Sequence, residues 1–256
     1  MTDDIIQLNI TDELATISLN RPNQLNALNF SMLQAIDSAL DTVESRRDIR
    51  GIIFAGEGRS FAAGADVGEL RELDESQMLA HPMPRLYQRI RSLDIPTIAA
   101  VQGFALGGGF ELALACDLRI AGESAEFGLP ELSLGIIPGA GGTQLLTRAL
   151  GEARALELIL TGNRLTATLA HTAGLVAAVV PDDELRQRAN ALLLRVTKHS
   201  RAAIASAKRT VYRALGDIAS GYEVETREQA VLSQTHDANE GMCAFIERRT
   251  PQFANE

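Results

Sequence analysis

The chain has 256 residues, of which 46% are hydrophobic and 4% aromatic, and its formal net charge is −9 at pH 7. This length suits one large domain, with or without a smaller appendage, and is enough to bury a substantial core. The acidic balance disfavours general nucleic-acid binding, which needs a clustered basic face, yet it is compatible with a local site for a phosphorylated ligand. No apolar run is long enough to span a bilayer, so we expect no membrane insertion.

The two cysteines, Cys116 and Cys243, form no CxxC pair and cannot build a disulfide framework. The first residues are acidic and lack the basic segment of a secretory signal. We therefore expect a cytoplasmic protein in a reducing compartment.

The first half of the chain alternates strand-like and helix-like segments. Residues 5–10 and 15–19 predict paired strands joined by a turn at Thr11 and Asp12. Asn29 is placed to cap a helix whose apolar residues recur at helical spacing: Met32, Leu33, Ile36, Leu40 and Val43. Residues 51–55 and 97–101 are short apolar runs that predict buried strands. This order is typical of an α/β core with largely parallel pairing.

The composition changes near residue 195. Beyond it, residues 202–215, 222–234 and 237–249 predict helices, and Gly216 and Gly221 are the main breaks. We divide the chain into a catalytic core at 1–195 and a helical C-terminal region at 196–256. Helices this few bury little by themselves, so the region is expected to pack on the core or on another subunit and to serve oligomerisation.

Known glycine-loop and nucleophile patterns do not fit. The glycines at 107–109 and 139–142 lack the spacing of a GxGxxG or a Walker loop. The chain has no GxSxG elbow and no HExxH pair, and its four histidines are scattered. Dinucleotide binding, serine-nucleophile chemistry and a metal site are therefore unsupported.

Residues 103–115 form the first candidate site: a turn, three glycines and then good helix formers. Glycines at a helix start let a substrate approach the backbone, and the first N–H groups there have no intrahelical partner. Such donors, with the helix dipole behind them, suit an incipient oxyanion, and Glu111 follows in the first turn. Tight helix–strand packing explains the glycines equally well, with Glu111 a favourable first-turn acid.

Two further segments are candidates. Residues 60–66 are small and leave the backbone accessible after a strand, although an ordinary strand-to-helix turn looks the same. Residues 127–144 carry Glu131 in an apolar stretch punctuated by proline and glycine. If buried, that carboxyl would have its pKa raised toward neutrality; if solvated, it is an ordinary loop acid.

Together these segments resemble the crotonase (enoyl-CoA hydratase/isomerase) superfamily. The resemblance covers essentially the whole chain and includes other short motifs: residues 20–22, 26–28, 173–176 and 240–242, with Phe245. It implies a ββα spiral core with a helical C-terminal oligomerisation region. It also implies trimers that commonly pair into hexamers.

The resemblance also implies a site. Glu111 and Glu131 would be the catalytic acids, the N–H groups of Ala65 and Gly108 the oxyanion hole, and Gly139 an aid to placing the water. The implied contacts to coenzyme A are Gln24, Leu25, Ala62, Ala65, Asp66, Val67, Gly68, Gly107, Gly108 and Arg249. Arg248 is the alternative to Arg249, and either would act from a neighbouring subunit.

Coenzyme A belongs to the acyl-CoA substrate, so no separate cofactor is expected. The chain departs from the common hydratase pattern at Leu129, where glutamine is frequent, and at Gly68, where lysine is frequent. The first departure would alter polarity near the water, and the second would remove a contact to the ligand's phosphate end. Residues 70–91, broken by Pro82 and Pro84, are the expected wall of the acyl pocket.

The two glutamates predict the reaction. Family hydratases carry both, whereas many double-bond isomerases keep only the acid that matches Glu131. We therefore expect hydration of enoyl-CoA to 3-hydroxyacyl-CoA in fatty-acid β-oxidation or related catabolism.

Several alternatives stay open. One is an enoyl-CoA isomerase, and another is an enzyme for a branched, aromatic-derived or dicarboxylic acyl-CoA. A non-enzymatic alternative is a crotonase-like protein that binds CoA esters or RNA. The basic residues that could serve RNA, Arg201, Lys208, Arg209 and Arg213, are more simply a solvated helix face.

Overall fold

A sheet of six strands forms the centre of the computed structural model, which describes residues 4–213 and 218–255. Strands β1 (Ile6–Thr11) and β2 (Leu14–Leu19) pair as the predicted antiparallel hairpin, with Asp12 and Glu13 at positive φ in the turn. The turn therefore lies one residue later than predicted. Four more strands follow β2 in parallel: β3 (Gly51–Gly56), β4 (Thr97–Val101), β6 (Leu118–Gly122) and β9 (Val179–Val180).

A second sheet of three short strands lies beside the first. Its members are β5 (Phe104–Leu106), β7 (Glu126–Gly128) and β8 (Leu165–Thr166). Strands β4 and β5 are followed by helix α5 (Gly108–Ala115). Strands β6 and β7 and the helix that comes after them repeat this strand–strand–helix order. The ββα spiral implied by the family resemblance is thus confirmed.

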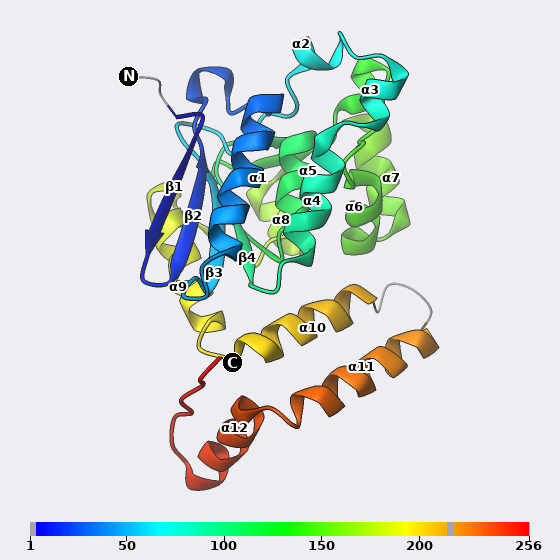
Figure 1. Cartoon of the computed structure of the whole chain (residues 1–256). Helices are drawn as coiled ribbons and strands as arrows, with labels where there is room; N and C mark the ends of the chain where they lie inside the picture. Colours follow the sequence, from blue (N-terminus) through cyan, green and yellow to red (C-terminus); the bar gives the residue numbers. More distant parts are fainter. Residues whose placement is uncertain (1–3, 214–217, 256) are drawn as a thin grey trace.

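Helices cover both faces of the large sheet (Figure 1). Helix α1 (Phe30–Glu44) begins as predicted, because the Asn29 side chain accepts a hydrogen bond from the Met32 N–H at 2.9 Å. It buries all five apolar positions predicted from the spacing. Beside it lies α4 (Pro82–Ser92), and α9 (Leu185–Val196) packs on β3, β4 and β6 from the other face. The strand side chains are therefore buried on both faces of the sheet.

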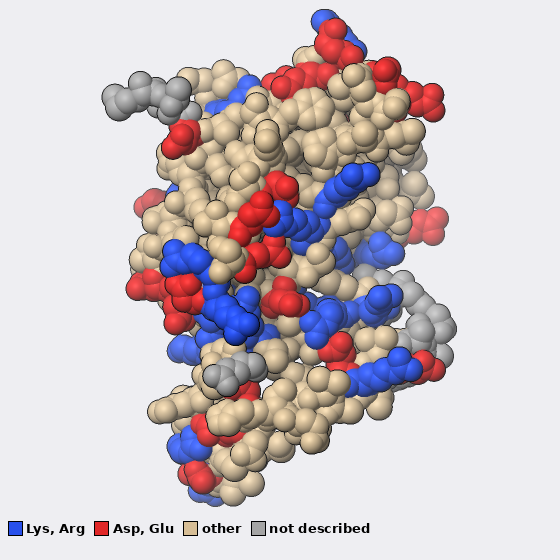
Figure 2. Space-filling view, in the orientation of Figure 1, with Lys and Arg blue, Asp and Glu red and all other residues tan. Residues whose placement is uncertain are grey.

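Shorter elements complete the core. They are the 3-10 turns η1 (Pro22–Gln24), η2 (Glu131–Leu134) and η3 (Asp182–Glu184), and the helices α2 (Val67–Leu70), α3 (Glu75–Leu79), α6 (Gly142–Leu150), α7 (Glu152–Thr161) and α8 (Ala167–Thr172). Acidic side chains gather over α2 and α3 (Figure 2). No helix in the part of the chain that the structure describes is both long and apolar enough to cross a bilayer.

Three helices follow the core, as predicted: α10 (Arg201–Arg213), α11 (Ile218–Leu232) and α12 (His236–Glu247). They extend away from the sheets, with α11 and α12 farthest from α2 and α3 (Figure 1). The predicted break at Gly216 lies outside the described residues. The division of the chain at residue 195 stays a prediction, and α9 ends next to it.

The expected solvated basic face of α10 is only partly confirmed, because Arg209 and Arg213 are exposed whereas the Lys208 side chain is 11% exposed. Lys208 Nζ lies 2.8 Å from Asp117 Oδ2 and donates to the Ile95 carbonyl at 2.7 Å. Arg209 pairs with Asp94 and Glu228. Basic side chains accordingly run along the seam between α10 and the core (Figure 2). Lys208 and Arg209 are thus engaged by carboxylates of the same chain, which weakens the observation that favoured RNA binding.

Candidate active site

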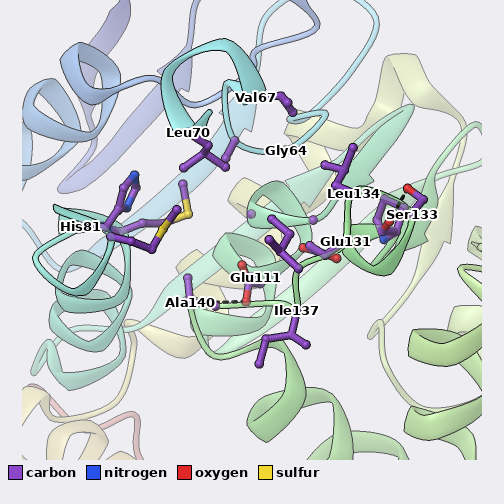
Figure 3. Close-up of a pocket in the computed structure, with 18 of the residues that line it drawn as sticks. Gly64, Val67, Leu70, His81, Glu111, Glu131, Ser133, Leu134, Ile137 and Ala140 are labelled. Carbon is purple, nitrogen blue, oxygen red and sulfur yellow. Dashed lines mark hydrogen bonds between the residues drawn. The ribbon is translucent and has the colours of Figure 1, made fainter. Parts of the chain in front are cut away.

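A largely apolar cavity of about 700 Å³ lies between α2, the start of α4, the N-terminus of α5 and the loop that contains η2. Only four of its lining residues have polar side chains: His81, Glu111, Glu131 and Ser133. Figure 3 shows the two glutamates near the middle of the cavity, with Val67 and Leu70 on one side and Ile137 on the other. The structure therefore brings together two acids that lie 20 residues apart in the sequence.

Glu111 projects from the first turn of α5 and is only 2% exposed. Its Oε1 accepts hydrogen bonds from the backbone N–H groups of Ala140 at 2.7 Å and Gly142 at 2.8 Å. Burial raises the pKa of this carboxyl, while the two donors favour its charged form and oppose the shift. The donors fix one oxygen and leave the other, Oε2, available to a ligand.

The glycines at 139–142 are explained by this contact. A Cβ on Gly142 would lie 3.0 Å from Glu111 Oε1 and 2.8 Å from Pro138 Cβ. Gly141 has φ +112°, a conformation that other residues rarely adopt. The segment at 139–142, whose glycine spacing matches no phosphate-binding loop, thus binds the carboxylate of Glu111. Sequence reasoning missed Ala140 and Gly142 as its donors, because backbone donors leave no signal in side-chain type.

Glu131 opens η2 and is 9% exposed. Its Oε2 has no hydrogen-bond partner among the described residues. Burial raises the pKa of this carboxyl to about 7, and the charge of Glu111 adds to the shift. A Cβ on Gly107, which has φ +49°, would come within 2.9 Å of Glu131 Oε1, so the carboxyl rests against the glycine turn that starts α5.

Two backbone N–H groups complete the site. Neither Ala65 nor Gly108 donates its N–H to an acceptor within the described ranges. Both residues line the cavity, and a Cβ on Gly108 would lie 3.4 Å from the Ala65 nitrogen. The Gly108 peptide is held by Tyr87, whose hydroxyl donates to the Gly108 carbonyl at 2.7 Å. The two predicted oxyanion donors are therefore neighbours and are free to bind a ligand.

The loop that carries Ala65 is pinned by Leu28. The Leu28 N–H donates to the Gly64 carbonyl at 2.8 Å, and the Asp66 N–H donates to the Leu28 carbonyl at 2.9 Å. The Gly64 carbonyl belongs to the same trans peptide group as the Ala65 N–H, so the two point in opposite directions. The Ala65 N–H itself is left facing away from this ladder, toward the cavity.

A buried asparagine explains the early motif at 20–28. Asn26 is fully buried at φ +57°, and its side-chain amide donates to the carbonyls of Glu57 and Ser60 at 2.9 and 2.8 Å. Its Oδ1 accepts from the Arg21 N–H at 2.8 Å, and the Arg21 side chain reaches Asp66. Sequence reasoning used this motif only for the resemblance. The structure shows that it braces the loop before Ala65.

The predicted coenzyme A contacts fall into two groups. Ala65, Val67, Gly107 and Gly108 line the cavity, as does Gly139, the residue assigned to the water. The others lie outside its lining: Gln24, Leu25, Ala62, Asp66, Gly68 and Arg249.

Ala62 is 0% exposed and its backbone pairs with Phe104 and Leu106, so its predicted contact with the ligand has no support from the cavity lining and stays a prediction. The Leu25 carbonyl accepts from the Ala63 N–H. The Asp66 carboxylate is already bound by Arg21 and by the Gly68 N–H.

Arg249 follows α12, far from the cavity within one chain (Figure 1). Its guanidinium binds both oxygens of Glu240, at 2.6 and 2.8 Å. Its predicted contact therefore depends on a neighbouring subunit. Leu129 is fully buried and does not line the cavity, and its expected effect on polarity near the water stays a prediction.

The predicted acyl wall at 70–91 contributes Leu70, Met78, His81, Met83 and Pro84 to the cavity. Sequence reasoning missed the opposite wall, formed by Leu134, Ile136 and Ile137 between η2 and α6. The sequence signal for this wall was a run of large apolar residues in a glycine-rich loop. Exposed apolar runs of this kind commonly mark a binding site or an interface.

Comparison with known proteins agrees with this geometry. The family model described as enoyl-CoA hydratase/isomerase matches residues 9–256. A probable enoyl-CoA hydratase of Mycobacterium tuberculosis is 41% identical over 100% of both chains, and the 2,3-dehydroadipyl-CoA hydratase of Escherichia coli is 41% identical over 93% of each. A crystal structure of an enoyl-CoA hydratase from Bacillus anthracis superposes with a TM-score of 0.93 at 38% identity, over 99% of this chain and 100% of that one. The chain belongs to the enoyl-CoA hydratase/isomerase family.

Proposed function

We propose that the protein is an enoyl-CoA hydratase, which adds water across the 2,3 double bond of an enoyl-CoA thioester to give 3-hydroxyacyl-CoA. The observation that carries this proposal is the meeting of two buried carboxyl groups beside two unpaired backbone N–H groups in one apolar cavity. The named hydratases among its relatives support it.

The N–H groups of Ala65 and Gly108 would bind the thioester oxygen. As water attacks the β-carbon, negative charge moves onto this oxygen to give an enolate-like state. Each well-placed donor in such a site stabilises the transition state by about 3–4 kcal/mol. Because Gly108 is the first residue of α5, the dipole of that helix acts in the same direction.

The different surroundings of the two glutamates suggest their roles. Glu111, whose charged form is favoured by two backbone donors, would take a proton from the attacking water through its free oxygen. Glu131, with a pKa of about 7, is partly protonated at neutral pH and would give its proton to the α-carbon. The water's oxygen bonds to the β-carbon, and the proton gained by Glu111 returns to Glu131 through solvent. General acid–base help of this kind contributes roughly 10²–10⁴ in rate.

The direct test is loss of the conjugated thioester absorbance of crotonyl-CoA. We expect hydration by the parental protein and a fall in kcat of at least about 10² in Glu111→Gln and in Glu131→Gln, with KM little changed. An isomerase would instead convert a 3-enoyl thioester and leave crotonyl-CoA intact. That outcome, or near-parental hydration by either variant, would overturn the proposal.

We also propose a homotrimer or a dimer of trimers, with residues 196–256 as the oligomerisation region. Large apolar side chains stand exposed on α11 and α12, among them Val231, Phe245 and Ile246, and such surfaces commonly meet another subunit. Besides water, the acyl-CoA thioester would be the only small molecule needed, since the chemistry is proton transfer and addition. A cytoplasmic location stays a prediction from cysteine usage.

A further inference from the structure

A second cavity of about 410 Å³ adjoins the first, and we call it the arginine annex. It lies between α4, the loop at 138–141 and α6. Pro84, Gly139 and Ala140 line both cavities and so form their common wall. The lining of the annex differs in chemistry from that of the first cavity, because it includes Arg91 and Arg148.

The two annex arginines have no anionic partner. Among the residues the structure describes, neither Arg91 nor Arg148 forms an ion pair or a side-chain hydrogen bond. Arg89, two residues before Arg91 on the same helix, contacts three carboxylates. The nearby Asp117 is already bound by Lys208, Thr97 and Tyr212. Within the described part of the chain, the annex therefore carries two cations that no carboxylate contacts directly.

Arg91 is also held in place. Its guanidinium carbon lies 3.7 Å from the centre of the Tyr212 ring, a cation–π contact that orients the planar group. Burial lowers the pKa of Arg91, the charges of Tyr212 and Asp117 oppose this shift, and the charge of Arg148 adds to it. Arg91 is partly buried and Arg148 is exposed, and an anion between the two guanidinium groups would relieve their mutual repulsion.

We infer that the arginine annex binds a carboxylate at the far end of the acyl chain, so that the preferred substrates are enoyl-CoA monothioesters of dicarboxylic acids. This inference rests on the proposed hydratase function. In this proposal, an acyl chain whose thioester oxygen is bound at Ala65 and Gly108 extends past the glutamates toward Pro84, Gly139 and Ala140, which line both cavities. The annex lining beyond them includes two guanidinium groups, which favour an anionic chain end over a terminal methyl group.

A carboxylate suits the annex in charge and shape. Guanidinium groups bind planar carboxylates through paired, charge-assisted hydrogen bonds. Such a contact also recovers part of the cost of keeping Arg91 away from bulk water. Gln88 and Gln144, which line the same cavity, supply further amide donors.

The test compares pairs of trans-2-enoyl-CoA thioesters of equal chain length, one ending in a methyl group and one in a carboxylate. The quantity measured is the ratio of their kcat/KM values, carboxylated over methyl-ended. We expect the parental protein to favour the carboxylated thioester. We expect Arg148→Gln and Arg91→Gln each to lower the ratio at least tenfold, which corresponds to about 1.4 kcal/mol. Arg148→Lys should keep part of the preference.

Arg85→Gln is the matched control, because Arg85 is exposed on the same helix as Arg91 and lines neither cavity. It should leave the ratio within about twofold of the parental value, as distant surface changes usually do. Arg148 is exposed, so its replacement is expected to leave the melting temperature unchanged and keeps the test valid if Arg91→Gln destabilises the fold.

A parental ratio near one, or a ratio unchanged in Arg148→Gln, would overturn the inference while the hydratase proposal stands. Hydration of neither thioester would overturn the hydratase proposal itself. The ratio should also fall as ionic strength rises, because the contact is between charges; a salt-independent preference would contradict the assignment to the arginines.

Discussion

Glu111 and Glu131 are chemically identical side chains that the fold places in different electrostatic surroundings. Both are buried, which raises the pKa of each. Two backbone donors oppose the shift at Glu111, whereas Glu131 has an oxygen with no partner in the described part of the chain. Such a difference in surroundings is the usual basis for giving one carboxyl the role of base and the other that of acid.

This difference predicts the pH dependence of hydration. The folded-state pKa of Glu131 is about 7, above its ordinary value, so the proton needed at the α-carbon is present below pH 7 and is lost as the pH rises through that value. We expect kcat/KM to fall about tenfold per pH unit on the alkaline side. In Glu131→Asp, a shorter acid that does not reach the same buried position, the residual activity should show a shifted alkaline limb. If the alkaline fall in activity occurred at the same pH in Glu131→Asp as in the parental protein, a group other than residue 131 would be responsible for it.

Gly142 gives a second prediction at the scale of one residue. A methyl group there would press on the Glu111 carboxylate and on Pro138, and would displace the loop that donates to Glu111. Gly142→Ala should lower kcat more than tenfold with a smaller change in KM, because misplacement of a catalytic group affects the transition state most.

The control for Gly142→Ala is Gly241→Ala on α12, where the added carbon would meet Phe253 at an ordinary 3.4 Å. It should retain parental kinetics, and it gains helix propensity. Equal kinetic loss in both variants would point to a general effect on folding.

At the scale of elements, the segment before Ala65 depends on a single buried amide. Asn26→Ala removes the partners of two carbonyls and one N–H group, in a residue whose positive φ already disfavours a replacement. Unsatisfied buried polar groups of this kind cost about 1–3 kcal/mol each, so we expect the free energy of unfolding to fall by at least about 2 kcal/mol. Urea denaturation measures it.

Asn163→Ala, at an exposed asparagine with no side-chain hydrogen bond among the described residues, is the matched control for Asn26. It should stay within about 0.5 kcal/mol of the parental protein. If Asn26→Ala were equally mild, the brace would not hold the loop.

The helices and strands also show which features of the fold can be predicted from the sequence. The capped helix after Asn29 was predictable, because apolar spacing and a capping side chain are local signals. The strands of the small sheet were not, since β5, β7 and β8 have two or three residues each and owe their form to pairing across the chain. The two acids and the oxyanion donors Ala65 and Gly108 were predicted from the family resemblance. The donors to Glu111, at Ala140 and Gly142, were not, because backbone donors leave no signal in side-chain type.

For the whole molecule, the decisive feature is that the sheets and the site form one body while α11 and α12 extend from it (Figure 1). Helix α10 is fastened to the core by Lys208 and Asp117, which no local pattern announces because the two residues are 91 positions apart. Beyond α10, helices α11 and α12 carry large apolar side chains that are exposed to solvent in the single chain. This arrangement predicts that folding of the core and assembly of the oligomer are separable.

Phe245 on α12 tests that separation, because it is 84% exposed in the single chain. A charge in a buried subunit contact is costly, so Phe245→Asp should yield a smaller species by light scattering, while the far-ultraviolet spectrum of the core persists. The matched control is Leu79→Asp, since Leu79 is 81% exposed on α3, far from α12, and should keep the parental mass. If Phe245→Asp assembled normally and Leu79→Asp did not, the interface would lie on the α3 side, and residues 196–256 would lose their proposed role in oligomerisation.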